Sequence, residues 1–212
     1  MTRSDHAAAP DLRATLRRIA WLSIGLGLAV QLVSTAIALG HGNAFLPAKA
    51  VADALGRVSW STLVCVGVAA GMMASGGAPA ASGLAGLVAA PVAFGAAKGV
   101  QQSVATILGA GAGGGMALAT LAAIGTLKAV EYGCLGLAIA RFERQQRGSL
   151  RAYLGVGLAL GLVFGTAIWA VSPAGALRPP SAALLTFAVN EVLFPAGCAM
   201  VLYGGNVVGR RL

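Results

Sequence analysis

Four ionisable residues stand inside long apolar stretches of the sequence: Lys98, Lys128, Glu131 and Glu191. Lys128 and Glu131 are three residues apart, so they share one face of a helix and each can partly neutralise the other. A charged side chain at the centre of a membrane-spanning helix costs roughly 2.5–3.5 kcal/mol, so it normally faces protein or water and has a partner. Residue type and spacing therefore predict a cluster of opposite charges inside a membrane.

These four residues are expected at a similar depth. Counted from the expected helix ends, they lie about 9 to 15 residues deep, which is ~14 to ~22 Å at helical rise. We expect the third, fourth and sixth apolar stretches to pack together with the charges inward, joined by Gln101 and Asn190. Thr126 and Thr186 are further candidates, whereas Gln102 is expected to pack or to line water beside Gln101. The predicted substrate or ion pathway consists of Lys98, Gln101, Lys128, Glu131, Asn190 and Glu191.

The cluster has two interpretations. In the first, Glu131 or Glu191 takes up a proton or cation and a small solute or ion crosses between the helices, as in a transporter or channel-like protein. In the second, the charges only fix which helices are neighbours, and the chain is a non-transporting membrane subunit or assembly factor that binds other transmembrane helices. A solvent-connected cavity that reaches either glutamate favours the first, and a dry, fully paired interior beside an exposed Gly/Ala face favours the second.

Composition indicates the class of protein. The chain has 212 residues, of which 58% are hydrophobic and 10% charged, and its mean hydropathy is +0.82. These values are typical of an all-α, polytopic membrane helix bundle. The net charge of +9 comes from cations that flank the apolar stretches, so we expect no nucleic-acid partner.

We expect neither an enzyme nor a bound cofactor or metal. The sequence has no phosphate loop and no nucleophile paired with a base. Its three cysteines (Cys65, Cys134 and Cys198) fall singly within apolar stretches, and both histidines (His6 and His41) fall outside them. No spacing is that of a metal site.

Six apolar stretches predict six transmembrane helices, over 19–40, 58–75, 83–107, 116–140, 152–172 and 181–203. Together they form one domain over 19–207, between a cytoplasmic tail at 1–18 and a basic cytoplasmic tail at 208–212. Residues 41–57 are expected to form a short interfacial segment outside the membrane. The basic start and Ala36-Ile37-Ala38 resemble a secretory signal, but an apolar part of ~20 residues exceeds the usual ~7–15, so we expect an uncleaved first span.

Basic residues indicate the orientation, because they concentrate on the cytoplasmic side. If the N-terminus lies in the cytoplasm, six spans place three basic residues on the outer side of the membrane, namely Lys49, Arg57 and Arg178. Ten fall inside: Arg3, Arg13, Arg17, Arg18, Arg141, Arg144, Arg147, Arg151, Arg210 and Arg211. This distribution predicts a multi-pass protein of the cytoplasmic (inner) membrane with both termini in the cytoplasm.

Small residues predict where helices approach one another. Ala85, Ala89 and Ala93 recur every four residues in the third stretch, and Gly157, Gly161 and Gly165 do so in the fifth. Such stripes allow close contact between membrane helices. The expected partners are membrane lipid and either another membrane protein or a second copy of the chain.

Short matches along the chain suggest an internal repeat. Gly25-Leu-Gly-Leu-Ala29 resembles Gly155-Val-Gly-Leu-Ala159, and each even-numbered stretch holds one cysteine in a similar setting. The matches are those of three parallel two-helix hairpins, an arrangement frequent in transporters. Gly/Ala-rich sequence also produces such matches by chance, so the sequence leaves both explanations open.

Overall fold

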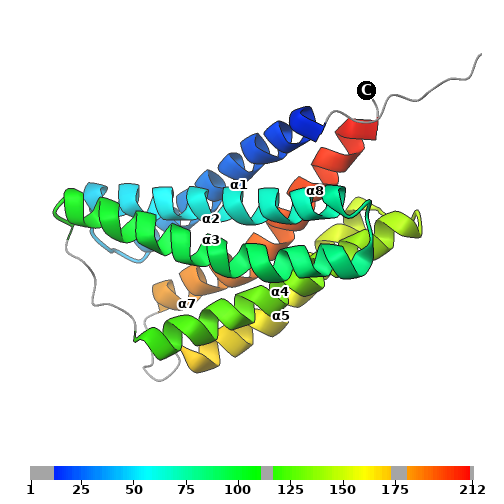
Figure 1. Ribbon diagram of the computed structural model, residues 1–212. Helices are drawn as coiled ribbons and strands as arrows, with labels where there is room; N and C mark the ends of the chain where they lie inside the picture. The colour runs from blue at the N-terminus through cyan, green and yellow to red at the C-terminus, as the bar shows by residue number, and fades with distance from the viewer. Residues whose placement is uncertain (1–11, 111–116, 173–180, 211–212) are drawn as a thin grey trace, which may run out of the picture.

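Six long helices form a bundle in the computed structural model, which describes residues 12–110, 117–172 and 181–210 (Figure 1). The helices are α1 (Leu12–Gly40), α2 (Pro47–Ala74), α3 (Pro79–Ile107), α4 (Leu118–Arg144), α5 (Leu150–Val171), and a sixth span made of α7 (Ser181–Ala188), η1 (Val189–Leu193) and α8 (Phe194–Arg210). Each of the six spans is long and apolar enough to cross a membrane. The predicted all-α bundle of six spans is confirmed, and no strand occurs among the described residues.

The connections alternate between two ends of the bundle (Figure 1). The starts of α2, α4 and α7 lie at one end, here called the α1–α2 end. The first turn of α1 and the last turn of α8 lie at the opposite, terminal end. Several predicted features fall wholly or partly outside the described residues, namely the tails at 1–18 and 208–212 and, among the basic residues counted for orientation, Arg3, Arg178 and Arg211.

Local sequence explains where the helices begin and turn. Pro47 and Pro79 open α2 and α3 at the first helical position, where the missing N–H has no intrahelical partner to lose. Ser149 caps α5 by accepting a hydrogen bond from the backbone N–H of Ala152. Gly76 and Gly77, both with positive φ, make the tight α2–α3 turn that residues with a Cβ rarely adopt.

The start of α2 differs from what was expected for residues 41–57. Residues 47–57 are not a separate interfacial segment, because they form the first three turns of α2. Lys49, Asp53 and Arg57 lower the local hydropathy, which hid this part of the helix. Their spacing of four residues places them on one face.

Small side chains let α2, α3 and α4 pack closely. A Cβ added at Gly71 would lie 1.9 Å from the Cβ of Ala85, and one at Gly67 would lie 2.6 Å from the Cβ of Ala89. On the other side of α3, a Cβ at Gly86 would lie 2.1 Å from the carbonyl oxygen of Tyr132 on α4. Contacts between these three helices are the most extensive in the bundle.

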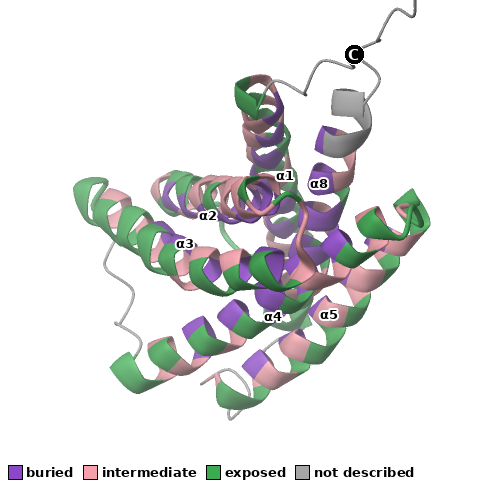
Figure 2. Ribbon diagram, turned by 45° about the vertical axis from the view of Figure 1, so that its right-hand side comes forward, coloured by how far each residue is buried: buried purple, intermediate pink, exposed green. Residues whose placement is uncertain are grey.

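Burial follows the inward faces of the helices, as the colours of Figure 2 show. The core joins residues of all six spans, including Ile19, Cys65, Ala93, Leu135, Tyr153 and Cys198. Large exposed side chains such as Leu84, Val88 and Val92 lie along the outward face of α3. In a membrane, these side chains face acyl chains.

The cysteines do not support three equivalent hairpins. Cys65 and Cys198 are buried, and their sulfur atoms lie 2.9 Å apart, whereas Cys134 is exposed. The sixth span also contains a π-helix at Val189–Leu193, which α2 and α4 lack. The internal repeat remains a hypothesis.

Candidate functional site

Three of the four predicted ionisable residues form one cluster in the middle of the bundle, here called the charged cluster. Lys128 Nζ lies 2.8 Å from Glu131 Oε2 on the same helix and 2.7 Å from Glu191 Oε2 on η1. Lys128 is ten residues from the start of α4 and Glu191 ten from the start of α7, which places both ~15 Å from the α1–α2 end. The cluster therefore joins α4 to the sixth span at mid-membrane depth.

The charges of this cluster do not balance. Two carboxylates face one ammonium group, so full ionisation leaves a net charge of −1 in a setting where the Glu131 side chain is 0% exposed. The second oxygen of that side chain, Oε1, is buried without a hydrogen-bond partner. An uncompensated charge in low dielectric is costly, and one bound proton would remove it.

The π-helix and the proline that follows it place Glu191 in the cluster. Pro195 has no N–H to donate to the carbonyl of Glu191, four residues earlier, and its ring crowds that position. The wider turn of a π-helix accommodates this defect, and such turns occur frequently at functional sites. Asn190 Nδ2 donates to the carbonyl oxygen of Thr186 at 2.9 Å and so satisfies another backbone group in this turn.

The π-helix η1 packs against the glycine stripe of α5. A Cβ at Gly161 would lie 2.8 Å from the Cα of Val192, and one at Gly165 would lie 3.0 Å from the Cβ of Glu191. At Gly157 it would lie 2.5 Å from the Cα of Ala196. Contact this close between backbones fixes the direction in which the Glu191 side chain projects.

A cavity of about 390 Å³, here called the charged cavity, extends from the α1–α2 end to the charged cluster. It is lined by Lys49, Asp53, Gly56, Arg57, Trp60, Phe94, Ala97, Lys98, Gln101, Lys128, Thr186, Asn190, Glu191 and Phe194. A neighbouring cavity of about 460 Å³ reaches the α1–α2 loop and shares Lys49, Asp53, Arg57 and Thr186 with it. The two cavities therefore join the α1–α2 loop to the side of the cluster that Lys128 and Glu191 form.

Side-chain exposure falls stepwise along this route. It is 62% for Lys49, 20% for Asp53, 15% for Glu191, 7% for Lys128 and 0% for Glu131. Glu131 does not line the charged cavity itself and lies behind Lys128. The cluster thus has one side that lines the cavity and one side that is fully buried.

Polar contacts between α2 and α3 hold the wall of the cavity nearest the α1–α2 end. Asp53 accepts hydrogen bonds from Lys49 Nζ and from Gln101 Nε2, each at 2.6 Å. Lys98 Nζ donates to Gln101 Oε1 at 3.2 Å. Asp53 is therefore already bound by two donors from two helices.

Aromatic rings surround the ammonium group of Lys128. Its Nζ lies 5.9 Å from the ring centroids of Trp60 and Tyr132, and these two rings meet edge to face at 5.4 Å. Cations over aromatic faces gain about 0.5–2 kcal/mol. The rings therefore help to hold Lys128 between its two carboxylates.

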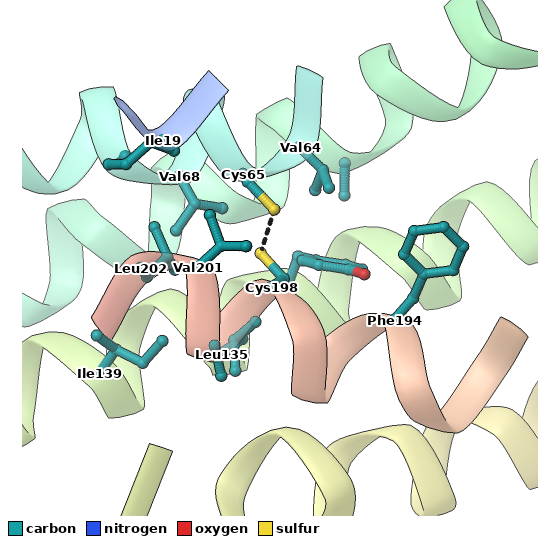
Figure 3. Packing of buried hydrophobic residues seen from close by; sticks show 14 of the residues in the cluster. Ile19, Val64, Cys65, Val68, Leu135, Ile139, Phe194, Cys198, Val201 and Leu202 are labelled. Atoms are coloured by element: carbon teal, nitrogen blue, oxygen red, sulfur yellow. Dashed lines mark hydrogen bonds between the residues drawn. The ribbon is translucent and has the colours of Figure 1, made fainter. Parts of the chain in front are cut away.

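Beyond the cluster, apolar side chains pack closely around Cys65 and Cys198, as Figure 3 shows. Phe194 lines the charged cavity. A second cavity, of about 310 Å³, is lined by Leu202, Glu143 and Arg144. Phe194 and Leu202 both belong to α8 and are eight residues apart. The helical rise over these eight residues is ~12 Å. The layer between the two cavities, here called the barrier, contains Val64, Cys65, Val68, Leu135, Cys198 and Val201, all buried.

The structure places the predicted pathway residues as follows. Lys98, Gln101, Lys128, Asn190 and Glu191 line the charged cavity, and Thr186 joins them. Lys98 was expected to converge with the other three charges, but it makes no ion pair within 4.0 Å among the described residues, and the cavity separates α3 from the sixth span. Thr126 and Gln102 are exposed and line no part of the cavity.

Five cavity residues on α2 escaped the sequence analysis: Lys49, Asp53, Arg57, Trp60 and Gly56. The spacing of the first three was the signal that could have identified them. A lysine, an aspartate and an arginine at intervals of four residues, immediately before an apolar stretch, indicate one charged helix face.

Comparison of the chain with models of protein families, with curated proteins and with solved structures gives no match. Function is therefore inferred from the geometry of the site.

Proposed function

We propose that the protein is a membrane transport protein in which the charged cluster takes up a proton and the charged cavity admits a small solute. The observation that supports this most is the cavity that runs from the α1–α2 end to the cluster, where carboxylates outnumber ammonium groups by two to one. A purely structural network would be better served by matched charges in a dry interior. In this protein, one side of the charged cluster lines a cavity, and the Oε1 atom of Glu131 is buried without a hydrogen-bond partner.

The arrangement fits one state of an alternating-access cycle. The charged cavity opens at the α1–α2 end, and the barrier of apolar side chains separates it from the cavity at the terminal end. Binding sites of many transporters lie near mid-membrane beside interrupted helices. The sixth span is helical throughout, but the π-helix beside the cluster interrupts its regular α-helical hydrogen bonding.

For orientation, we propose the cytoplasmic membrane with both termini inside, because the basic residues concentrate at the terminal end. Arg17, Arg18, Arg141 and Arg147 belong to that end. The charged cavity then opens toward the outside. We propose that the protein has no enzymatic activity.

Proton movement in proteoliposomes tests this function. Vesicles containing the purified protein and an internal pH-sensitive dye are exposed to inward gradients of sodium succinate, sodium aspartate, glycine or choline chloride. Wild-type protein is expected to move protons under at least one gradient, and Glu131→Gln and Glu191→Gln are expected to abolish this movement. The control Arg151→Gln removes an exposed charge at the start of α5 and is expected to behave as wild type. Absence of protein-dependent proton movement under every gradient and under an imposed membrane potential contradicts the proposal.

A further inference from the structure

We propose that Lys98 and Arg57 form a binding site for the carboxylate group of a small organic anion inside the charged cavity. This inference rests on the proposed transport function and names the class of solute. It starts from the cations of the cavity that have no ion-pair partner among the described residues. The cavity lining, together with Glu131 behind Lys128, carries four cations (Lys49, Arg57, Lys98 and Lys128) and three carboxylates (Asp53, Glu131 and Glu191), a net charge of +1.

Two of the four cations already have carboxylate partners. Lys49 lies 2.6 Å from Asp53, and Lys128 is held between Glu131 and Glu191. Lys98 and Arg57 have no carboxylate oxygen within 4.0 Å among the described residues. They lie on α3 and α2 and line the same cavity, where the charge of Asp53 acts on both of them from beyond ion-pair distance and the charge of Arg57 acts on Lys98.

The hydrogen bonds of these two cations leave donors free. Arg57 Nη1 donates to the carbonyl oxygen of Val30 at 3.0 Å and to Ser34 Oγ, and these contacts with α1 fix the guanidinium plane. Its Nη2 and Nε make no hydrogen bond with any described residue. Lys98 Nζ donates only to Gln101 Oε1, which leaves two of its three N–H groups free. A planar guanidinium with free, fixed donors matches the two oxygens of a carboxylate.

The size and the remaining walls of the cavity favour an organic anion. A volume of about 390 Å³ falls at the lower end of the ~300–1,000 Å³ typical of small-molecule pockets. Trp60, Phe94 and Phe194 contribute apolar surface beside the charged groups. An anion with a carbon skeleton gains contacts there that a chloride ion does not.

The anion site and the charged cluster are electrostatically linked. Glu191 lies near enough to Lys98 for their charges to interact. A proton bound at the cluster makes the cavity more positive by one unit and so favours a bound anion, and a bound anion favours the proton to the same extent. The geometry therefore points to an organic anion carried together with a proton.

Binding in detergent tests the site without requiring transport. The midpoint of thermal unfolding is followed as a function of sodium propionate or sodium succinate concentration, against sodium chloride and tetramethylammonium chloride at equal ionic strength. Wild type and the control Arg151→Gln are expected to be stabilised by at least one carboxylate, saturably and beyond chloride. Lys98→Gln is expected to weaken the apparent affinity at least about tenfold, because a hydrogen bond to a charged group is lost.

Two conservative variants, Lys98→Arg and Arg57→Lys, distinguish loss of binding from misfolding. Arg57→Gln removes contacts with α1, so Arg57→Lys, which keeps the charge and loses the planar fork, is measured beside it. Lys98→Arg is expected to retain binding, and Arg57→Lys to weaken it while the unliganded protein stays folded. A carboxylate effect equal to that of chloride, or unchanged in Lys98→Gln, overturns the inference, as does binding of the tetramethylammonium cation alone.

The two proposals fail in different ways. If protons move with a cation or with glycine and need Glu131 and Glu191 but not Lys98, the transport function stands and the anion site is wrong. If carboxylates bind at Lys98 and Arg57 but no proton movement depends on the glutamates, the site stands and the transport function is wrong.

Discussion

Replacement of Lys128 by methionine is expected to lower the free energy of unfolding by about 3–5 kcal/mol, because two buried carboxylates lose their shared cation. Glu131 is 0% exposed and Glu191 is 15% exposed, so water compensates little of that loss. Glu131→Gln should have a smaller effect, since Lys128 keeps Glu191 as its partner and the net charge of the cluster becomes zero. Unfolding titrations with SDS in mixed micelles measure both changes.

Two further variants control this prediction. Thr126→Met changes an exposed position two residues away on the same helix and should leave stability unchanged. The triple variant Lys128→Met, Glu131→Gln, Glu191→Gln removes every charge of the cluster and should recover part of the stability lost in Lys128→Met. A Lys128→Met protein as stable as wild type contradicts the ion pairs.

Gly161→Ala is expected to abolish transport and to cost about 1–3 kcal/mol of stability, occasionally more, because overpacking between two backbones cannot relax by rotating a side chain. Its added Cβ would lie 2.8 Å from the Cα and from the carbonyl oxygen of Val192, and 2.9 Å from the carbonyl oxygen of Glu191. The π-helix must move away from α5, which displaces Glu191 from Lys128. Transport in proteoliposomes and SDS titration measure the two effects.

Gly155→Ala is the matched control on the same helix, since nothing lies within 4 Å of a Cβ added there. It should leave transport intact and stabilise α5 slightly, because alanine has a higher helix propensity than glycine by roughly 1 kcal/mol in water. Equal effects of the two substitutions would show that the stripe does not position η1.

The sequence predicted the spans well because apolar stretches of this length leave few alternatives in a bilayer. Its error at 41–57 came from charges. Lys49, Asp53 and Arg57 made the first turns of α2 read as a polar connection, although a charged helix face toward a cavity has the same composition. Hydropathy averages over all faces of a helix, so it does not distinguish a polar connection from a helix with one charged face.

Five of the six predicted pathway residues line the charged cavity, but their contacts were only partly predictable from the sequence. Lys128 and Glu131 were recognisable from a spacing of three on one helix. Their contact with Glu191 depends on how α4 meets the sixth span, which follows from the glycine stripe of α5 and the π-helix. Lys98 was placed with the other three charges from depth alone, and depth along a helix axis carries no information on lateral position.

Thiol accessibility tests the central claim, that water from one side of the membrane reaches the middle of the bundle. The measurement uses Asn190→Cys and Thr126→Cys in a Cys134→Ser background, where the remaining native cysteines, Cys65 and Cys198, are buried. The two positions lie at similar depth, nine and eight residues from the starts of α7 and α4, but only Asn190 lines the charged cavity. We predict that a membrane-impermeant methanethiosulfonate modifies Asn190→Cys from the side of the α1–α2 loop and leaves Thr126→Cys unmodified. Equal resistance of both cysteines, from either side, would contradict a water-filled route to the cluster.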